Sequence, residues 1–320
     1  VRWVKTRIRI FYASDIHGSE VCFRKFINAA KAYKVDVLIL GGDITGKVLV
    51  PIIEKGGKYF AELGGKKWEA ASQAELNTLI RSIRDSGFYT VVLTEDEFLK
   101  IKDNPQLVDN LFNEIMVKTV SSWIKLADER LDGSNIECYL MPGNDDRVTI
   151  DDAFKCSARV VNPDCKVLEI KGGLKLVSLG LSNPTPWRTS REYPEEVIYE
   201  KLNRLIRSAE DPDITLLNVH VPPYGTPIDL APLLDHTLRP VTRGGQAEMV
   251  HVGSISVRKI IEEFQPLTSL HGHIHESRGV IRIGKTQCFN PGSDYSSGAL
   301  RGVLLEVERG KVKNYMFTYG

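Results

Sequence analysis

The sequence has few cysteines, no long apolar run and almost no net charge, and each absence excludes a class of protein. Five cysteines are scattered along 320 residues without a Cys-x-x-Cys pair, which predicts reduced thiols in a cytoplasmic protein. No stretch approaches the roughly 20 apolar residues of a membrane span. The run Ile8 to Ala13 is short and leads into Ser14-Asp15, so we expect a first strand there and not a secretion signal.

The charges nearly cancel, with 42 Lys and Arg against 41 Asp and Glu. A basic excess that would favour nucleic acid is missing, and so is an acidic tail that would indicate disorder. Hydrophobic residues make up 42% and charged residues 26%, which is typical of a soluble globular protein. The chain also lacks internal repeats, and its length suits one large α/β domain, which we assign to residues 1–320.

Apolar runs alternate with helical patterns along most of the chain, which predicts a sheet buried on both faces. The first half has strands expected at Ile8–Ala13, Val35–Leu40 and Ile136–Met141, and a helix at Glu20–Tyr33. The second half has strands expected at Cys165–Ile170, Leu174–Leu179, Ile214–Val219, Leu267–Leu270, Val280–Ile283, Thr286–Phe289, Gly302–Val307 and Val312–Thr318, and helices at Glu195–Ser208 and Ser254–Phe264. Two β-rich layers with helices outside predict an α/β fold, a four-layer α/β/β/α sandwich of two mixed sheets.

Residues 54–131 interrupt this alternation. The segment opens with four glycines and then shows helical patterns near Ala71–Arg84 and Pro105–Arg130, with a short strand at Tyr89–Leu93 between them. Apolar residues recur at helical spacing in its last part, so that helix should bury one face. We therefore predict a helical insertion packed on the sheet, and it contains none of the candidate ligands described next.

Five short polar motifs stand where a predicted strand ends. Open α/β sheets bind ligands beyond the carboxyl ends of their strands, so these motifs are expected to converge on one rim. They are Asp15-Ile16-His17, Gly42-Asp43, Gly143-Asn144-Asp145-Asp146, Asn218-Val219-His220 and Gly272-His273-Ile274-His275.

The residue types in these motifs indicate a metal centre. Carboxylate, imidazole and amide oxygen are ligands for divalent ions such as Mn²⁺, Fe²⁺ and Zn²⁺, and the absence of cysteine argues against a structural zinc site. Four of the seven histidines lie in the motifs. The two rings of a His-x-His pair point in different directions, so His273 and His275 can serve two ions about 3.5–4 Å apart. Each motif alone is common by chance, and the ordered set is what carries the prediction.

In this order the motifs resemble those of the calcineurin-like metallophosphoesterase superfamily. The resemblance runs from Asp15 to about Asp294, apart from the insertion. Further segments make the chain most similar to the Icc-related branch of predicted phosphoesterases: Pro142-Gly143-Asn144-Asp145-Asp146, Asn183-Pro184-Thr185-Pro186-Trp187, His220-Val221-Pro222-Pro223-Tyr224 and Asn290-Pro291-Gly292-Ser293.

The resemblance implies a hydrolase with two divalent metal ions, with Mn²⁺ expected and Fe, Zn²⁺ or Ni²⁺ as alternatives. It implies that a hydroxide between the ions attacks the phosphorus of a small phosphoester, such as a nucleotide. The implied ligands of one ion are Asp15, His17 and His275, those of the other are Asn144, His220 and His273, and Asp43 bridges. Asp43, Asn144, Asp145 and His220 are the candidate catalytic residues.

Asp145 departs from the family pattern, because many members have a histidine at this position that serves as a proton donor or phosphate contact. A carboxylate beside two cations should be ionised at neutral pH, so it is a poor general acid. It would also repel a dianionic monoester more than a monoanionic diester. These arguments favour phosphodiesters, although Asp145 can also turn away to cap the next element, and Asp146 is expected to be a turn or cap residue.

Asp145, Trp187 and Arg188 are the candidate substrate contacts. An arginine beside the Pro-rich loop, Arg188 or Arg191, can pair with phosphate, and the alternative is a packed Trp with solvated arginines. Other functions also stay open. A nuclease of the same superfamily is disfavoured by the neutral charge, while a phosphomonoesterase and a non-catalytic scaffold on this fold are further alternatives. We expect no membrane contact, and His271 should pack behind the site.

Overall fold

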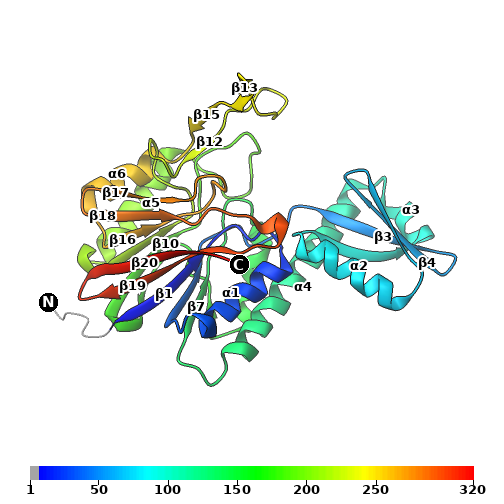
Figure 1. Ribbon diagram of the computed structural model, residues 1–320, viewed down its shortest axis with the longest axis horizontal. Helices are drawn as coiled ribbons and strands as arrows, with labels where there is room; N and C mark the ends of the chain where they lie inside the picture. Colours follow the sequence, from blue (N-terminus) through cyan, green and yellow to red (C-terminus); the bar gives the residue numbers. More distant parts are fainter. Residues whose placement is uncertain (1–6) are drawn as a thin grey trace.

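In the computed structural model, which describes residues 7–320, two six-stranded sheets lie face to face (Figure 1). In the first, β1, β2, β7 and β8 are parallel, and β19 runs antiparallel to its neighbours β1 and β20. In the second, β10, β11, β16 and β18 are parallel, and the edge strands β9 and β17 are antiparallel to them. The first sheet has the order β20 (Lys311–Tyr319), β19 (Arg301–Glu308), β1 (Ile8–Ala13), β2 (Val37–Leu40), β7 (Glu137–Leu140) and β8 (Val160–Val161). The second has the order β17 (Gly279–Ile283), β18 (Thr286–Asn290), β16 (Thr268–Leu270), β11 (Thr215–Val219), β10 (Leu174–Leu179) and β9 (Lys166–Ile170).

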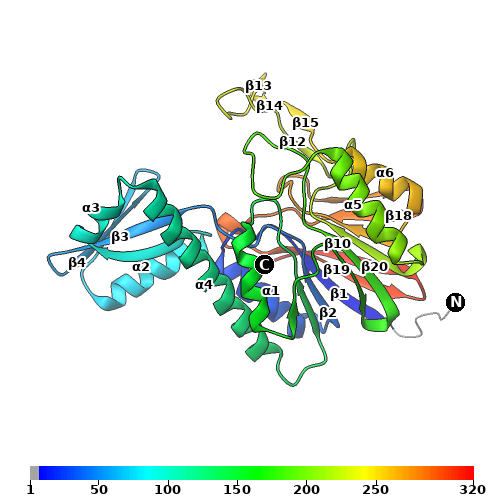
Figure 2. The ribbon, with the colours of Figure 1, turned by 180° about the vertical axis from the view of Figure 1, so that it is seen from behind.

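Helices cover the outer face of each sheet. α1 (Glu20–Ala32) and α4 (Pro105–Leu131) pack on the first sheet, and α5 (Glu195–Ser208) and α6 (Ile255–Phe264) pack on the second, as the view from behind in Figure 2 also shows. Short 3₁₀ helices span Val148–Cys156, Lys171–Gly173, Pro212–Ile214 and Tyr295–Ser297. The predicted four-layer α/β/β/α fold is therefore confirmed.

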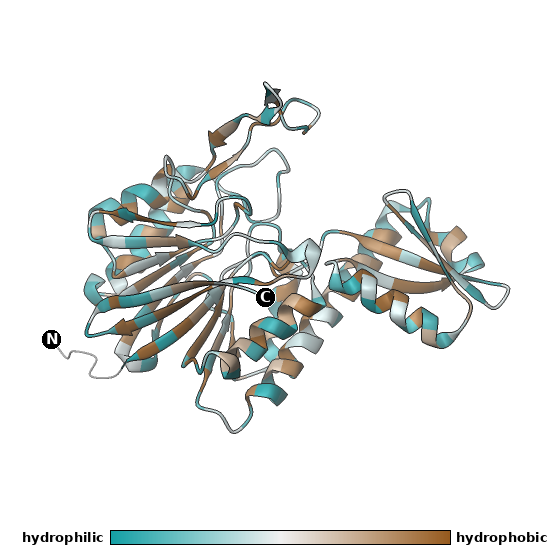
Figure 3. Ribbon diagram, in the orientation of Figure 1, coloured by the Kyte–Doolittle hydropathy of each residue, from teal (hydrophilic) through white to brown (hydrophobic). Residues whose placement is uncertain are grey.

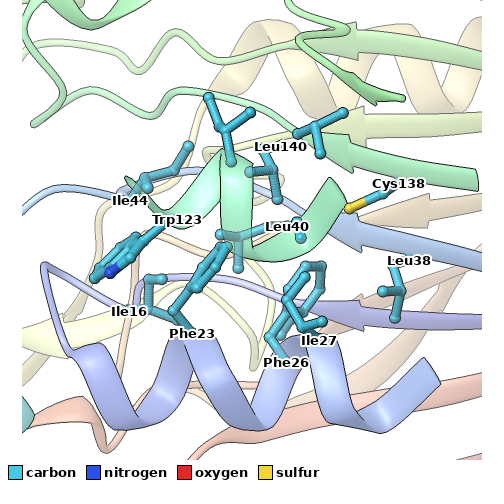
Figure 4. Close-up of a cluster of buried hydrophobic side chains, with 14 of the residues drawn as sticks. Ile16, Phe23, Phe26, Ile27, Leu38, Leu40, Ile44, Trp123, Cys138 and Leu140 are labelled. Atoms are coloured by element: carbon cyan, nitrogen blue, oxygen red, sulfur yellow. The ribbon is translucent and has the colours of Figure 1, made fainter. Parts of the chain in front are cut away.

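Three apolar cores hold the four layers together. In β1, Ile10 faces the second sheet and Phe11 faces α1, so both sides of this strand are buried. Figure 3 shows apolar residues along the strands of both large sheets. In the core under α1, Phe23 stacks on Trp123 of α4 with ring centroids 4.6 Å apart, and both lie near Leu40 and Leu140 (Figure 4). Continuous burial explains why these strands read as apolar runs in the sequence.

The inserted segment differs from the helical elaboration predicted over residues 54–131. It contains a four-stranded sheet with the order β5 (Lys66–Ala70), β4 (Lys58–Leu63), β3 (Leu49–Lys55) and β6 (Tyr89–Thr94), together with α2 (Gln73–Asp85) and α3 (Glu95–Ile101). The paired glycines Gly56-Gly57 and Gly64-Gly65 all have positive φ and join β3 to β4 and β4 to β5. Two-residue hairpin turns favour glycine for this reason. α2 and α4 match the two predicted helices and β6 the predicted strand, whereas β3, β4, β5 and α3 were not predicted. The sheet projects from the side of the body (Figure 1).

A second, smaller projection follows β11. It consists of two two-stranded ribbons, β12 (Leu230–Pro232) with β15 (Met249–His251) and β13 (Thr242–Arg243) with β14 (Gln246–Ala247). All five cysteines are unpaired. Within residues 7–320, we find no helix whose length and apolar character would let it span a bilayer. The assignment of a cytoplasmic location stays a prediction.

Candidate metal centre

The five motifs converge because they follow β1, β2, β7, β11 and β16, which run parallel within their sheets. The loops after β1 and β2 are joined directly, with the Asp15 N–H donating to the Gly42 carbonyl at 3.0 Å and the His17 N–H to the Asp43 carbonyl at 3.0 Å. The loop after β16 joins the one after β11, where the Gly272 N–H donates to the His220 carbonyl at 2.9 Å. The topology therefore places all five loops on one rim.

Within residues 7–320, three groups of side chains could each hold a metal ion, and within each group the ligand atoms lie within 4.8 Å of one another. The first comprises Asp15, His17 and His275, and the second comprises Asp43, His220 and His273; the third, His17, Asp43 and Asp145, overlaps both. The first two groups touch, because His220 Nε2 of the second group is 3.8 Å from Asp15 Oδ1 of the first. Within the second group, His220 Nε2 is 3.3 Å from Asp43 Oδ2. His17 Nε2 is 3.6 Å from Asp43 Oδ2, so Asp43 lies between the groups.

Asn144 joins the second group through its neighbour in the chain. The Asp145 N–H donates to Asp43 Oδ1 at 3.0 Å, which fixes the Gly143–Asp145 turn against this carboxylate. Asn144 itself is buried, with 3% of its surface exposed. The structure thus brings six of the seven predicted ligands into these groups and places the seventh, Asn144, in the turn held against Asp43.

The glycines of two motifs, Gly42 and Gly143, let a backbone approach a ligand closely. A Cβ on Gly42, whose φ is 126°, would lie 2.1 Å from His220 Nδ1, and a Cβ on Gly143 would lie 2.2 Å from Asp43 Oδ1. Neither side chain could then keep its place. The Gly-Asp and Gly-Asn pairs therefore reflect packing around the ligands, and any larger residue would displace a ligand side chain.

Four of the seven ligand residues have left-handed backbone. The φ angles are 57° at Asp15, 39° at His17, 50° at Asp43 and 68° at His273. Such residues cost about 1–3 kcal/mol each and collect at functional sites, where the surrounding structure holds them. The Asp15 carboxylate accepts from the His273 N–H at 3.0 Å and so holds one of these strained positions.

The ligand atoms fit a cation better than they fit one another. His220 Nδ1 lies 3.0 Å from the Gly41 carbonyl, so Nδ1 donates to this carbonyl and Nε2 faces the site. His220 Nε2, His17 Nδ1 and Asn144 Oδ1 are buried without a hydrogen-bond partner. His17 Nε2 and His275 Nε2 are 3.0 Å apart, a distance at which both can reach one ion with bonds of roughly 2.1 Å.

The two carboxylates have opposite electrostatic environments. Burial acts to raise the pKa of Asp15, but contact with His275 and the positive charges of His220 and His17 outweigh it and hold that pKa well below its usual range. Burial raises the pKa of Asp43 to about 7; the charge of Asp145 adds to this, and His220 opposes it. Asp15 is therefore a fixed negative charge, whereas Asp43 competes for a proton near neutral pH.

The buried histidines show where positive charge is favoured. Burial acts to lower the pKa of His220, yet Asp43 and Asp15 raise it to about 10. Burial and the charge of His220 lower the pKa of His273 to about 3. The carboxylates thus attract one positive charge to the position of His220, and a divalent cation would meet the same attraction.

Asp145 faces the site and does not turn away. Its carboxylate lies 3.8 Å from His17 Nδ1 and forms an ion pair with Lys47, whose side chain is 52% exposed. Burial acts to lower the pKa of Lys47, but the charge of Asp145 has the larger effect, so the pKa is raised overall. Sequence reasoning missed Lys47, although it follows Gly42-Asp43 by only four residues in the loop after β2.

Asp146 is a cap residue, as predicted. Its buried carboxylate accepts from the N–H groups of Gly143, Ile44 and Thr45 at 2.7–2.9 Å and from the Thr45 hydroxyl at 2.6 Å. The loops after β2 and β7 are therefore tied together by one carboxylate. This arrangement explains why two acidic residues follow Asn144, one facing the site and one bracing it.

The Asn290-Pro291-Gly292-Ser293 segment braces the Gly-His-x-His loop. The Asn290 side-chain amide donates to the Ile274 carbonyl at 3.0 Å, and the Ser293 hydroxyl donates to the Asp15 carbonyl at 2.6 Å. His271 lies behind the site, where its Nδ1 contacts the Val219 carbonyl at 2.9 Å, and burial lowers its pKa to about 4. These residues support the ligands without reaching the rim.

The Pro-rich loop does not match the alternative of a packed Trp with solvated arginines. Trp187 is 60% exposed and Arg188 is also exposed, so the Trp is not packed. Arg191 is buried and pairs with Asp151 at 2.8 Å, and its Nε donates to the Asp146 carbonyl at 2.9 Å. Arg191 therefore cannot contact a substrate, because the fold uses its guanidinium to hold the loop after β7.

The insertion touches the site through its connection between α2 and β6, which the sequence did not reveal. A Cβ on Gly87, whose φ is 89°, would lie 2.5 Å from the His17 carbonyl, and the Gly46 N–H donates to the Tyr89 hydroxyl at 3.0 Å. Tyr295 also lies near the ligands, with its ring centroid 4.7 Å from that of His17. The loops that carry His17 and Lys47 therefore pack against the base of the insertion.

Comparison with known proteins supports the fold. No protein-family model matches the sequence. An uncharacterized protein of Methanocaldococcus jannaschii is 37% identical over 161 residues, which cover 49% of this chain and 64% of that protein, so less than two thirds of the relative is matched. A solved structure covers 98% of this chain and 99% of its own with a TM-score of 0.60 and 13% identity. A Thermus thermophilus protein, TT1561, gives 0.54 and 14% over the same shares.

At these identities the likeness concerns the fold alone. The chain has the four-layer α/β/β/α fold that its sequence pattern predicted.

Proposed function

We propose that this protein is a metal-dependent phosphoesterase that hydrolyses phosphate esters with two divalent ions. Asp15, His17 and His275 would hold one ion, and Asn144, His220 and His273 would hold the other, with Asp43 between them. The observation that carries this proposal is the division of the buried ligand atoms into two groups that touch at Asp43. Two buried ligand atoms without a hydrogen-bond partner, His220 Nε2 and Asn144 Oδ1, support it.

Two divalent ions, when bound, supply Lewis acidity that activates water and stabilises charge on a transferring phosphoryl group. The chain's own residues set the conditions for that chemistry. Asp15 and Asp43 bring two negative charges against a formal four positive ones, and the excess favours an anionic substrate. The Gly41 carbonyl orients the His220 ring, and the burial that keeps His273 neutral leaves its nitrogen lone pair free for a cation.

Phosphodiesters are the substrate class that we propose. The residue after Asn144 is Asp145, which is a poor proton donor, so a substrate that needs no protonated leaving group is favoured. Lys47 pairs with Asp145 and cancels much of its charge, so repulsion of monoesters is weaker than Asp145 alone would cause. The charge that remains still disfavours a dianionic monoester relative to a monoanionic diester. Trp187 and Arg188, both exposed on one loop, are proposed as rim contacts.

The test compares bis(4-nitrophenyl) phosphate with 4-nitrophenyl phosphate, using metal-free protein to which Mn²⁺ is added back. We expect Mn²⁺-dependent hydrolysis with faster turnover of the diester. Faster turnover of the monoester would contradict the substrate class and leave the metal site standing. A protein that takes up no Mn²⁺ and shows no activity would instead favour a scaffold role.

A further inference from the structure

The loop between β10 and α5 sets the orientation of the Asn144 side chain. The Asn144 amide nitrogen, Nδ2, donates to the Thr189 hydroxyl at 2.8 Å. The Thr189 hydroxyl donates to Glu192 Oε1 at 2.6 Å, and the Thr189 N–H donates to the same oxygen at 2.9 Å. The chain of contacts therefore runs from the proposed metal ligand, through a hydroxyl, to a carboxylate.

The direction of these hydrogen bonds follows from the chemistry of their ends. An ionised carboxylate can only accept, so the single proton of the Thr189 hydroxyl is committed to Glu192. The hydroxyl then offers only lone pairs to Asn144, which must present its NH₂ group. The carbonyl oxygen Oδ1 is left at the other end of the amide, buried and without a partner. The hydrogen bonds from Thr185 and Thr189 outweigh the effect of burial and lower the pKa of Glu192, which keeps the acceptor ionised.

The backbone of the same loop holds Asn144 from another side. The Arg191 N–H donates to the Asn144 carbonyl at 3.2 Å. Glu192 closes the loop on itself, because it also accepts from the Thr185 N–H at 2.8 Å and the Thr185 hydroxyl at 2.5 Å. Trp187 and Arg188 lie at the exposed part of this loop. This loop therefore carries both the residues that hold Asn144 and the proposed rim contacts.

We propose that Thr189 and Glu192 are positioning residues that hold the Asn144 amide with its oxygen, and not its nitrogen, toward the second metal ion. The inference rests on the proposed two-metal function. An amide nitrogen cannot ligate a cation, so a flipped Asn144 would remove one ligand of that ion. Binding of the first ion, at Asp15, His17 and His275, does not depend on the hydrogen bonds through Thr189 and Glu192.

The chain offers a matched pair of variants. Thr189→Val and Thr185→Val each remove one hydroxyl that donates to Glu192 Oε1, but only Thr189 contacts Asn144. Thr189→Ser keeps the hydroxyl. Each variant, with the wild type, is stripped of metal and titrated with Mn²⁺ by calorimetry. Thermal unfolding of the metal-free proteins serves as the check on folding.

We expect two binding steps for the wild type and for Thr189→Ser. Thr189→Val should weaken one step by roughly 10–100-fold, the usual effect of losing a group that orients a metal ligand, while the other step and the Thr185→Val protein stay unchanged. Equal weakening in both Val variants, or no weakening in either, would overturn the positioning role. Failure of the wild type to bind two ions would instead refute the proposed function itself.

Discussion

The body and the insertion are built from different kinds of strand. Strands of the body such as β2 and β11 are buried on both faces throughout, whereas β4 and β5 of the insertion alternate between exposed and covered positions. Every proposed metal ligand belongs to the body. The insertion has an apolar core of its own, formed by residues such as Val50, Ile52 and Leu79. The proposed metal site thus lies in the body alone, and the insertion meets it only where Gly87 and Tyr89 pack against the loops after β1 and β2.

The largest expected effect is on the body. Asp43→Asn keeps the shape of the side chain but removes the charge between the two ion positions, and stabilisation by metal is worth several kcal/mol. We expect phosphodiester hydrolysis to fall by at least about 10³-fold with an unchanged circular dichroism spectrum. Asp96→Asn, an exposed change in α3 of the insertion, is the control and should keep full activity. A fully active Asp43→Asn protein would refute the bridging role.

The insertion should be separable from the site in stability. Ile52→Ala removes a fully buried side chain from the insertion core and should destabilise that sheet by about 2–5 kcal/mol, measured by hydrogen exchange over residues 49–94. Mn²⁺ affinity should stay the same, because Gly87 and Tyr89, which pack against the ligand loops, are held by contacts with the body. Ile52 belongs to the separate core of the insertion. Leu176→Ala, an equally buried change between the large sheets, should lower global stability instead. Loss of metal binding in Ile52→Ala would show that the two regions are coupled.

Metal affinity should increase with pH. In the metal-free protein, Asp43 and His220 have pKa values raised to about 7 and about 10, so both hold protons below those values and a metal must displace them. Between about pH 7 and pH 8.5, Mn²⁺ affinity should rise up to about tenfold per pH unit, with release of about one proton. Calorimetry in two buffers of different ionisation enthalpy measures that proton. A flat profile would contradict this account.

Both raised pKa values also predict how the metal-free protein responds to pH. A group whose pKa is higher in the folded state stabilises the fold below its unfolded value, and this stabilisation is lost as the pH rises through the folded value. For His220 the loss spans about pH 6.5 to about pH 10. Bound metal should remove this part of the dependence, because it replaces the proton.

The smallest expected effect concerns the Lys47–Asp145 pair. Lys47→Met removes the ammonium group and leaves the Asp145 charge unopposed, so hydrolysis of the dianionic monoester should fall more than that of the diester. The pair is partly exposed, and a change in the ratio of about tenfold or less is expected. Lys55→Met, which breaks an exposed ion pair with Glu95 in the insertion, is the matched control. An unchanged ratio would show that Lys47 does not face the substrate.

The sequence predicted the body well and the insertion poorly for a physical reason. Strands of the body are recognisable because burial on both faces requires continuous apolar runs, and their ends mark the ligands. Hairpin strands such as Lys58–Leu63 carry charged residues on one face, so they lack that signal, and the glycine pairs between them indicate turns only once the strands are known.

The candidate site shows the same division. The motif residues Asp15 to His275 could be listed from the sequence because each follows a strand. Lys47, Thr189 and Tyr89 reach the site through contacts between loops, which depend on the packing of distant segments. Their residue types are common on any protein surface, so no local pattern distinguishes them. Arg191 shows the opposite case. The sequence made it a candidate phosphate contact, but its guanidinium is buried and bonds to the Asp146 carbonyl and to Asp151.

The proposed function requires that the protein binds two metal ions, one at each of the two groups of side chains. Crystals of the protein loaded with Mn²⁺, measured by anomalous diffraction, test this most directly. The account predicts two anomalous peaks, one beside Asp15, His17 and His275 and one beside Asn144, His220 and His273, with Asp43 in contact with both. A single peak, or a second peak away from Asn144 and His273, would contradict it.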